Sequence, residues 1–210
     1  MTIEDFGVRV ASVWQGLRPS TRNLVERALL APQVQPAAPK ATTARAGYDA
    51  RSEWELSRLL AALDERESES KGADALSAEQ ASELVRMADT CAGVLHNEAR
   101  SAEVFAQLLE RALRSRDYAR VDAVADAIAV RLAPSETCEL ARHPNPSVRA
   151  IAHEALLQTP TAVLVALLGD PVDAETARDA LEDQAEEYGS EEARWIVNAL
   201  NHADSSQEDI

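Results

Sequence analysis

Apolar residues recur at three- and four-residue steps over most of the chain, which is the period of one face of an α-helix. The first such stripe consists of Ile3, Phe6, Val10, Val13, Trp14 and Leu17. Further stripes return between residues 52 and 200, separated by short segments rich in Pro, Ser, Asn and Asp. Alanine and leucine abound, and β-branched residues never dominate a run, so the sequence predicts an all-α protein without strands.

The helix boundaries are marked by capping residues and by prolines. Ser52 with Glu55, and Ser77 with Gln80, fit capping boxes that each open a helix. Asn145-Pro146 supplies a cap and a first-turn proline for another helix. The connections between these helices are short, so neighbouring helices are expected to pack antiparallel.

A long interruption of the helical pattern begins at Pro32. The segment contains three prolines, counting Pro32, and no acidic residue until Asp49, which is typical of an extended linker. We therefore expect a helical hairpin at 1–31, a linker at 32–50, a helical domain at 51–203 and a disordered acidic tail at 204–210. The apolar stripe of the hairpin needs a cover, which can be the chain's own helical domain, a partner protein or a second copy.

Three arginines, Arg120, Arg149 and Arg178, follow one another at 29-residue intervals, each near the predicted start of a helix. A fixed period of about 20–50 residues with helical content is the mark of a stacked-helix array. Arginines at that position can bind the carbonyls that end the preceding helix or an acid of the next unit. We interpret them as ties between helices rather than as ligand-binding residues.

The segment 140–149, Leu-Ala-Arg-His-Pro-Asn-Pro-Ser-Val-Arg, resembles a HEAT repeat and equally the related leucine-rich repeat variant. The continuation from Thr159-Pro160 to Asp170-Pro171 is also similar to the variant family. The resemblance covers roughly residues 115–202 and implies a short right-handed α-solenoid of HEAT-like repeats. The repeat positions that it assigns are Arg120, Pro144, Pro146, Arg149, Pro160, Pro171 and Arg178.

The net charge of −15 disfavours nonspecific binding to nucleic acid or to an anionic membrane. Residues 1–48 carry a charge of +3 and the remainder −18, so a basic arm precedes an acidic body. Cys91 and Cys138 stand alone in apolar helical patterns and are expected to be small buried hydrophobic residues. The N-terminal residues have neither a basic segment nor a long apolar one, so we expect no signal peptide and no membrane span, and hence a cytoplasmic protein.

One dipeptide, His153-Glu154, resembles those with which HEAT-type hydroxylases hold two irons. Those enzymes have several such dipeptides directly after the Val-Arg, whereas here one follows Arg149 by four residues. A metal site needs three or four convergent ligands, so we predict no catalytic residue, no metal and no cofactor. The alternative is a HEAT-type lyase or metal-dependent hydroxylase that acts on a small molecule or protein-bound cofactor, which requires His143, His153 and Glu154 to converge.

The predicted function is instead a noncatalytic scaffold or adaptor that binds another protein. An acidic stripe on the helix that starts at Asp173 is one candidate surface, and a solvated outer face is its other interpretation. The hairpin is a second candidate, for a partner or a second copy, and a tryptophan of the last helix is either an end cap or an anchor. The residues that we assign to protein contact are Phe6, Trp14, Glu175, Asp179, Glu182, Glu186 and Trp195.

Overall fold

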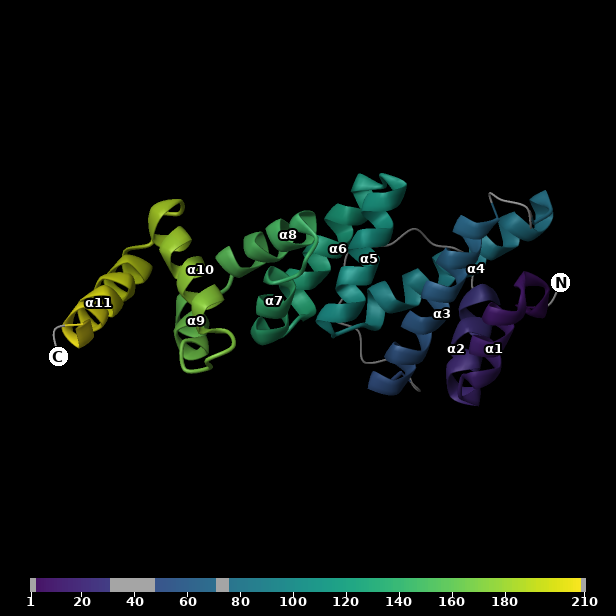
Figure 1. Cartoon of the computed structure of the whole chain (residues 1–210), viewed down its shortest axis with the longest axis horizontal. Helices are drawn as coiled ribbons and strands as arrows, with labels where there is room; N and C mark the ends of the chain where they lie inside the picture. Colours follow the sequence, from purple (N-terminus) through teal and green to yellow (C-terminus); the bar gives the residue numbers. More distant parts are fainter. Residues whose placement is uncertain (1–2, 31–47, 71–75, 209–210) are drawn as a thin grey trace. The chain divides into compact units, whose positions relative to one another are not determined.

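The computed structural model of the chain describes residues 3–30, 48–70 and 76–208, and all regular structure in these ranges is helical (Figure 1). The described residues form eleven α-helices and one 3-10 turn and contain no strand, which confirms the predicted all-α class. Residues 32–47 of the predicted linker lie outside the described residues.

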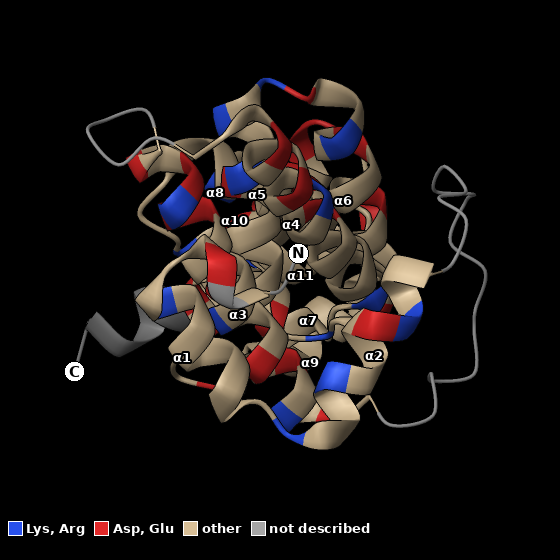
Figure 2. Ribbon diagram, turned by 90° about the vertical axis from the view of Figure 1, so that its right-hand side faces the viewer, with Lys and Arg blue, Asp and Glu red and all other residues tan. Residues whose placement is uncertain are grey.

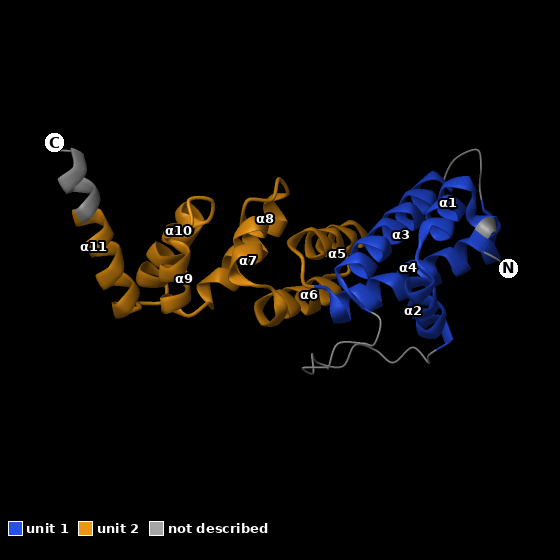
Figure 3. Ribbon diagram, turned by 90° about the horizontal axis from the view of Figure 1, so that it is seen from below, with its two compact units in different colours: residues 1–99 blue, residues 100–210 orange. Residues whose placement is uncertain are grey.

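The chain divides into two compact units, residues 1–99 and 100–210 (Figure 3). This division differs from the predicted one, which separated residues 1–31 from 51–203. The difference arises because the first two α-helices pack on the next two instead of standing apart.

The described residues of the first unit form the 3-10 turn and four α-helices. Its elements are η1 (Ile3–Phe6), α1 (Val8–Gly16), α2 (Pro19–Leu30), α3 (Ala50–Glu69) and α4 (Ala78–Glu98). Helix α1 packs on α3, and α2 packs on both α3 and α4. Gly7, with φ 110°, joins η1 to α1, a conformation that residues with a Cβ rarely adopt.

The apolar stripe of the N-terminal hairpin is covered within this unit. Phe6 and Val10 are each 1% exposed, and Leu24 and Val25 of α2 are also buried. Phe6, which the sequence assigned to a partner surface, is therefore a core residue. Trp14 is half-buried, and the Arg22 guanidinium lies 6.0 Å from the centroid of its ring.

A polar network fastens the start of α2 to the start of α3. The Asp49 side chain caps α3 by accepting from the Ser52 N–H at 2.7 Å, and Arg18 donates to the same carboxylate at 2.5 Å. Glu55, which is 2% exposed, accepts from the Thr21 hydroxyl at 2.5 Å and from the Arg18 backbone N–H at 3.3 Å. The first two helices and the turn between them carry four arginines, Arg9, Arg18, Arg22 and Arg27; lysine and arginine positions are blue in Figure 2.

These contacts set the pKa values of both carboxyl groups. The Arg18 side chain, and then the Ser52 N–H, hold the pKa of Asp49 far below its usual range. Burial alone would raise the pKa of Glu55, but the hydrogen bonds from Thr21 and Arg18 outweigh it and lower the pKa. The network is therefore built for two ionised carboxylates.

The described residues of the second unit form seven α-helices, six of which lie in two layers. The seven helices are α5 (Ala102–Ser115), α6 (Tyr118–Arg131), α7 (Pro134–Ala141), α8 (Pro146–Leu157), α9 (Thr161–Leu167), α10 (Ala174–Glu186) and α11 (Glu191–Glu208). Each helix contacts the next within the pairs α5–α6, α7–α8, α9–α10 and α10–α11. Contacts of α5 with α7 and α7 with α9 form one layer, and contacts of α6 with α8 and α8 with α10 form the other.

The three periodic arginines all lie in the layer of α6, α8 and α10. Arg120 is the third residue of α6, Arg149 the fourth of α8 and Arg178 the fifth of α10. Arg149 donates to the carbonyls of His143 and Pro144, both at 2.9 Å, in the turn before its helix. Arg178 reaches the Asn201 side chain of α11 at 2.6 Å, whereas the Arg120 guanidinium lies 3.5 Å from the Asp117 carboxylate that caps its own helix.

Other polar residues join one helix pair to the next. Glu136 of α7 accepts from the Ala102 N–H at the start of α5, at 2.6 Å. Arg142, just after α7, binds the buried Asp173 carboxylate at 3.0 Å. The Gln184 amide of α10 donates to the last carbonyl of α8, that of Leu157, at 3.0 Å.

Both cysteines are buried free thiols, as the apolar pattern predicted. Burial raises the pKa of Cys91 to about 12 and, with the nearby Asp173 charge, that of Cys138 to about 11. Cys138 belongs to the core of the second unit, together with Leu156, Leu164 and Leu181.

Two helix limits differ from the sequence interpretation. Helix α3 begins at Ala50 with Asp49 as its cap, so Ser52 and Glu55 do not form a capping box, whereas Ser77 and Gln80 do. Helix α11 continues to Glu208, past the predicted start of the tail, because residues 191–208 contain no proline or glycine to end it.

Removal of the Glu55 carboxylate is expected to destabilise the protein far more than removal of its exposed partner. Glu55→Ala leaves Thr21 and Arg18 without their buried acceptor and should lower the free energy of unfolding by about 3 kcal/mol. Arg51→Ala breaks a pair with the same carboxylate, but the Arg51 side chain is 68% exposed, so the expected loss is under about 1 kcal/mol. Urea unfolding followed by circular dichroism measures both, and equal losses would contradict the role given to Glu55.

The same network predicts an acid sensitivity. The pKa of Glu55 and that of Asp49 are lower in the folded than in the unfolded chain, so their stabilisation is complete above about pH 4.5 and disappears as pH falls through the folded values. Glu55→Gln should reduce the loss of stability between neutral and acidic pH. Urea unfolding midpoints of the wild type and the variant, measured across that pH range, test this expectation. If the midpoint of the variant falls with pH as steeply as that of the wild type, the expectation is wrong.

Candidate functional site

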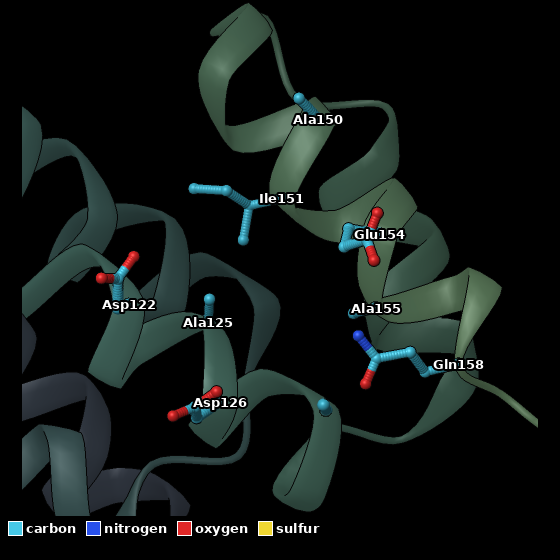
Figure 4. Close-up of a pocket in the computed structure, with 9 residues that line it drawn as sticks. Asp122, Ala125, Asp126, Ala150, Ile151, Glu154, Ala155 and Gln158 are labelled. Carbon is cyan, nitrogen blue, oxygen red and sulfur yellow. The ribbon is translucent and has the colours of Figure 1, made fainter. Parts of the chain in front are cut away.

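A groove of about 450 Å³ lies between α6 and α8 in the second unit (Figure 4). It is lined by one face of each helix: Asp122, Ala125, Asp126 and Ala129 from α6, and Ala150, Ile151, Glu154, Ala155 and Gln158 from α8. Ile151 points from α8 toward Asp122 and Ala125 of α6. None of the lining residues is a lysine or an arginine.

The floor of the groove is apolar because of the residues that face it. Four of the nine lining residues are alanines, at positions where larger side chains would fill the space between the two helices. Ile151 adds the only branched aliphatic side chain of the lining, and it is partly exposed. A partner side chain that enters the groove thus meets methyl groups at its base.

Carboxylates stand on both walls. Asp122 and Asp126 are exposed and lie one turn apart on α6. Glu154 stands on α8, where it accepts a hydrogen bond from the Tyr188 hydroxyl at 3.1 Å. This bond, with the Glu154 charge, raises the pKa of Tyr188, so the phenol remains a donor that holds the carboxylate.

The acidic stripe predicted on α10 continues the negative charge beyond α8. Glu175, Asp179 and Glu186 are exposed, and Glu182 is half-buried. Arg178 pairs with Glu182 at 3.2 Å, which compensates part of this charge. Partial desolvation, and then the charges of Glu175 and Glu182, raise the pKa of Asp179.

The residues that the alternative function as a lyase or metal-dependent hydroxylase requires, His143, His153 and Glu154, each contact a different partner. His153 Nδ1 lies 3.5 Å from the Asp183 carboxylate, and His143 Nδ1 accepts from the Asn145 N–H at 3.2 Å. Glu154 is engaged by Tyr188 instead. In the part of the chain that the structure describes, no three histidine, cysteine or acidic residues are grouped to hold a metal ion.

The remaining candidate contact residues are distributed over both units. Trp195 of α11 is 79% exposed, whereas Phe6 is buried and Trp14 half-buried in the first unit. The sequence interpretation missed Asp122 and Asp126. The sequence pattern that could have indicated them is Asp122, Ala125, Asp126 and Ala129, whose three- and four-residue spacing places aspartates and alanines on one helix face.

Comparison with known proteins does not assign this site, since no family model, curated protein or solved structure matches the chain. Among the described residues, no single helix is long and apolar enough to cross a membrane, although α8 and α9 together, bent by 118°, have the length and composition for it.

Neutralising one acid of α10 is expected to stabilise the protein. Since the folded pKa of Asp179 is raised, its charged form costs stability at neutral pH, and that cost disappears as pH falls through the folded pKa. Asp179→Asn should raise Tm at pH 7 by about 1–3 °C and give no gain below about pH 4.

The matched control is Glu192→Gln, which removes the same charge from the first turn of α11, where a negative charge is favourable. Calorimetry of both variants measures the difference. If Asp179→Asn has the wild-type Tm at pH 7, the α10 acids do not repel one another appreciably.

Proposed function

We propose that this protein is a noncatalytic scaffold that binds another protein through the layer formed by α6, α8 and α10. The observation that carries the proposal is the α6–α8 groove, which combines an apolar floor with carboxylates on both walls. Its volume of about 450 Å³ is within the usual range of binding sites. Apolar contact supplies affinity and the charged rim supplies selectivity.

We further propose that residues 100–210 form a short right-handed α-solenoid of HEAT-like repeats. Three features support this: the two layers of alternating helices, the proline at the first turn of α7 and α8, and the three arginines in a single layer. Stacked repeats expose an extended surface for partners. The buried free thiols support a cytoplasmic location, since such cysteines are typical of reducing compartments.

The N-terminal hairpin is not part of the proposed surface. Phe6, Val10, Leu24 and Val25 lie in the core of the first unit, and Arg9 and Arg18 pair with carboxylates of α3. Deleting residues 1–31 would therefore damage the fold of that unit rather than remove a docking arm. Substitutions in the groove are the sharper test.

Filling the groove is expected to remove the partner. Ala129 and Ala150 line the groove and are exposed, so Ala129→Leu with Ala150→Leu occupies it without entering the core. Affinity purification of the tagged full chain from its native cell, followed by quantitative mass spectrometry, should show at least about tenfold lower recovery of a specific partner, equivalent to roughly 1.4 kcal/mol.

The matched control places the same leucines at exposed alanines outside the groove, Ala119→Leu with Ala162→Leu. This variant should recover the partner as the wild type does, and equal melting temperatures of all three proteins verify the fold. If the wild type and both variants recover the same proteins in equal amounts, the groove binds no partner and the proposal fails.

A further inference from the structure

The charge and the floor of the groove together specify the chemistry of its occupant. We infer that the α6–α8 groove binds an amphipathic segment of a partner protein that carries arginine or lysine beside aliphatic residues. This inference rests on the proposed function, since it names the partner chemistry for the same groove.

The groove is much larger than a single ion or water molecule needs. A volume of about 450 Å³ is many times the roughly 30 Å³ that one water molecule occupies. Several side chains of a polypeptide segment fit such a space. The alanines of the floor let an aliphatic side chain of that segment approach both helices closely, with Ile151 as its larger apolar contact.

The walls define the charge of the occupant. Asp122 and Asp126 face Glu154 across the floor, so a segment in the groove meets carboxylates on both sides. Guanidinium and ammonium groups satisfy such acceptors with charge-assisted hydrogen bonds, and arginine can bind a carboxylate with two parallel bonds. An acidic segment would instead place like charges together, which costs affinity.

Two contacts, one from α10 and one from the turn that follows it, prepare the α8 wall. The Tyr188 hydroxyl holds Glu154 at 3.1 Å, and His153 lies 3.5 Å from Asp183. The first contact fixes a carboxylate before the partner arrives, which lowers the ordering cost of binding. The exposed Glu175, Asp179 and Glu186 lie beyond it and add attraction at longer range, which speeds the encounter with a cation.

The test uses the full chain and three fluorescent synthetic peptides of equal length. The first has leucine and arginine at helical spacing on separate faces, the second has the same composition in an order without faces, and the third has glutamate for arginine. Fluorescence anisotropy gives each Kd. We expect the first peptide to bind at least about tenfold more tightly than either of the others, and its affinity to fall as salt increases.

Two matched charge variants locate the binding. Asp122→Asn with Asp126→Asn and Glu154→Gln should weaken the first peptide at least about tenfold. Glu103→Gln with Glu139→Gln and Glu192→Gln removes three charges from exposed positions outside the groove and should leave Kd within about twofold. Ala129→Leu with Ala150→Leu should weaken binding as well.

Three results would overturn the inference. One is equal affinity of the wild type and the groove charge variant for the first peptide. Another is equal affinity of the wild type for the two arginine peptides, which would reduce the effect to net charge. The third is self-association of the wild type in sedimentation that the groove variants abolish, which would make a second copy the occupant.

The experiments distinguish failure of the inferred partner chemistry from failure of the proposed scaffold function. If no arginine peptide binds while filling the groove still removes a partner in affinity purification, the partner lacks the inferred chemistry and the proposed function stands. If the leucine substitutions change neither peptide binding nor partner recovery, both proposals fail.

Discussion

The packing of the second unit depends on hydrogen bonds to the backbone groups at its helix ends. Its helices run from 7 residues in α9 to 18 in α11, so a large share of the backbone lies in first and last turns that lack intrahelical partners. Side chains from neighbouring helices supply several of these bonds. Gln184, which is 5% exposed, donates to the Leu157 carbonyl that ends α8 and to the Thr159 carbonyl two residues later, and it accepts from the Thr161 hydroxyl at the start of α9. One amide thus connects three helices, and the layers hold together by polar bonds as well as by apolar burial.

Alanine links this packing to the proposed site. Ala152, Ala155, Ala177 and Ala180 are buried in α8 and α10, where small side chains let helices of one layer approach closely. On the α6–α8 side Ala125 is half-buried and Ala129 and Ala150 are exposed, and the two helices leave a groove between them. The use of alanine therefore explains both the close helix packing and the groove. Larger side chains at the groove positions would bury more apolar surface but would fill the proposed binding site.

The features that could be predicted from the sequence are local ones. The helix starts at Ser77 and Asn145 depend on residues within one turn, and both caps form as expected. The cap of α3 shows where local reasoning fails, because Glu55 forms its bonds with Arg18 and Thr21, more than thirty positions earlier in the chain. The burial of Phe6 and the pairing of α6 with α8 likewise depend on contacts between distant segments. The apolar periodicity of a single sequence shows that a helix has a face to bury, but it does not show which other helix will pack against that face.

The contact between Glu136 and Ala102 has a consequence for how this chain is made. The ribosome releases α5 before α7, so the acceptor for the first N–H of α5 emerges 34 residues after its donor. Ser101, the residue in the capping position, makes no side-chain capping hydrogen bond. A nascent chain that stops before Glu136 therefore has an incomplete start to α5, which becomes complete only when the second helix pair has left the exit tunnel.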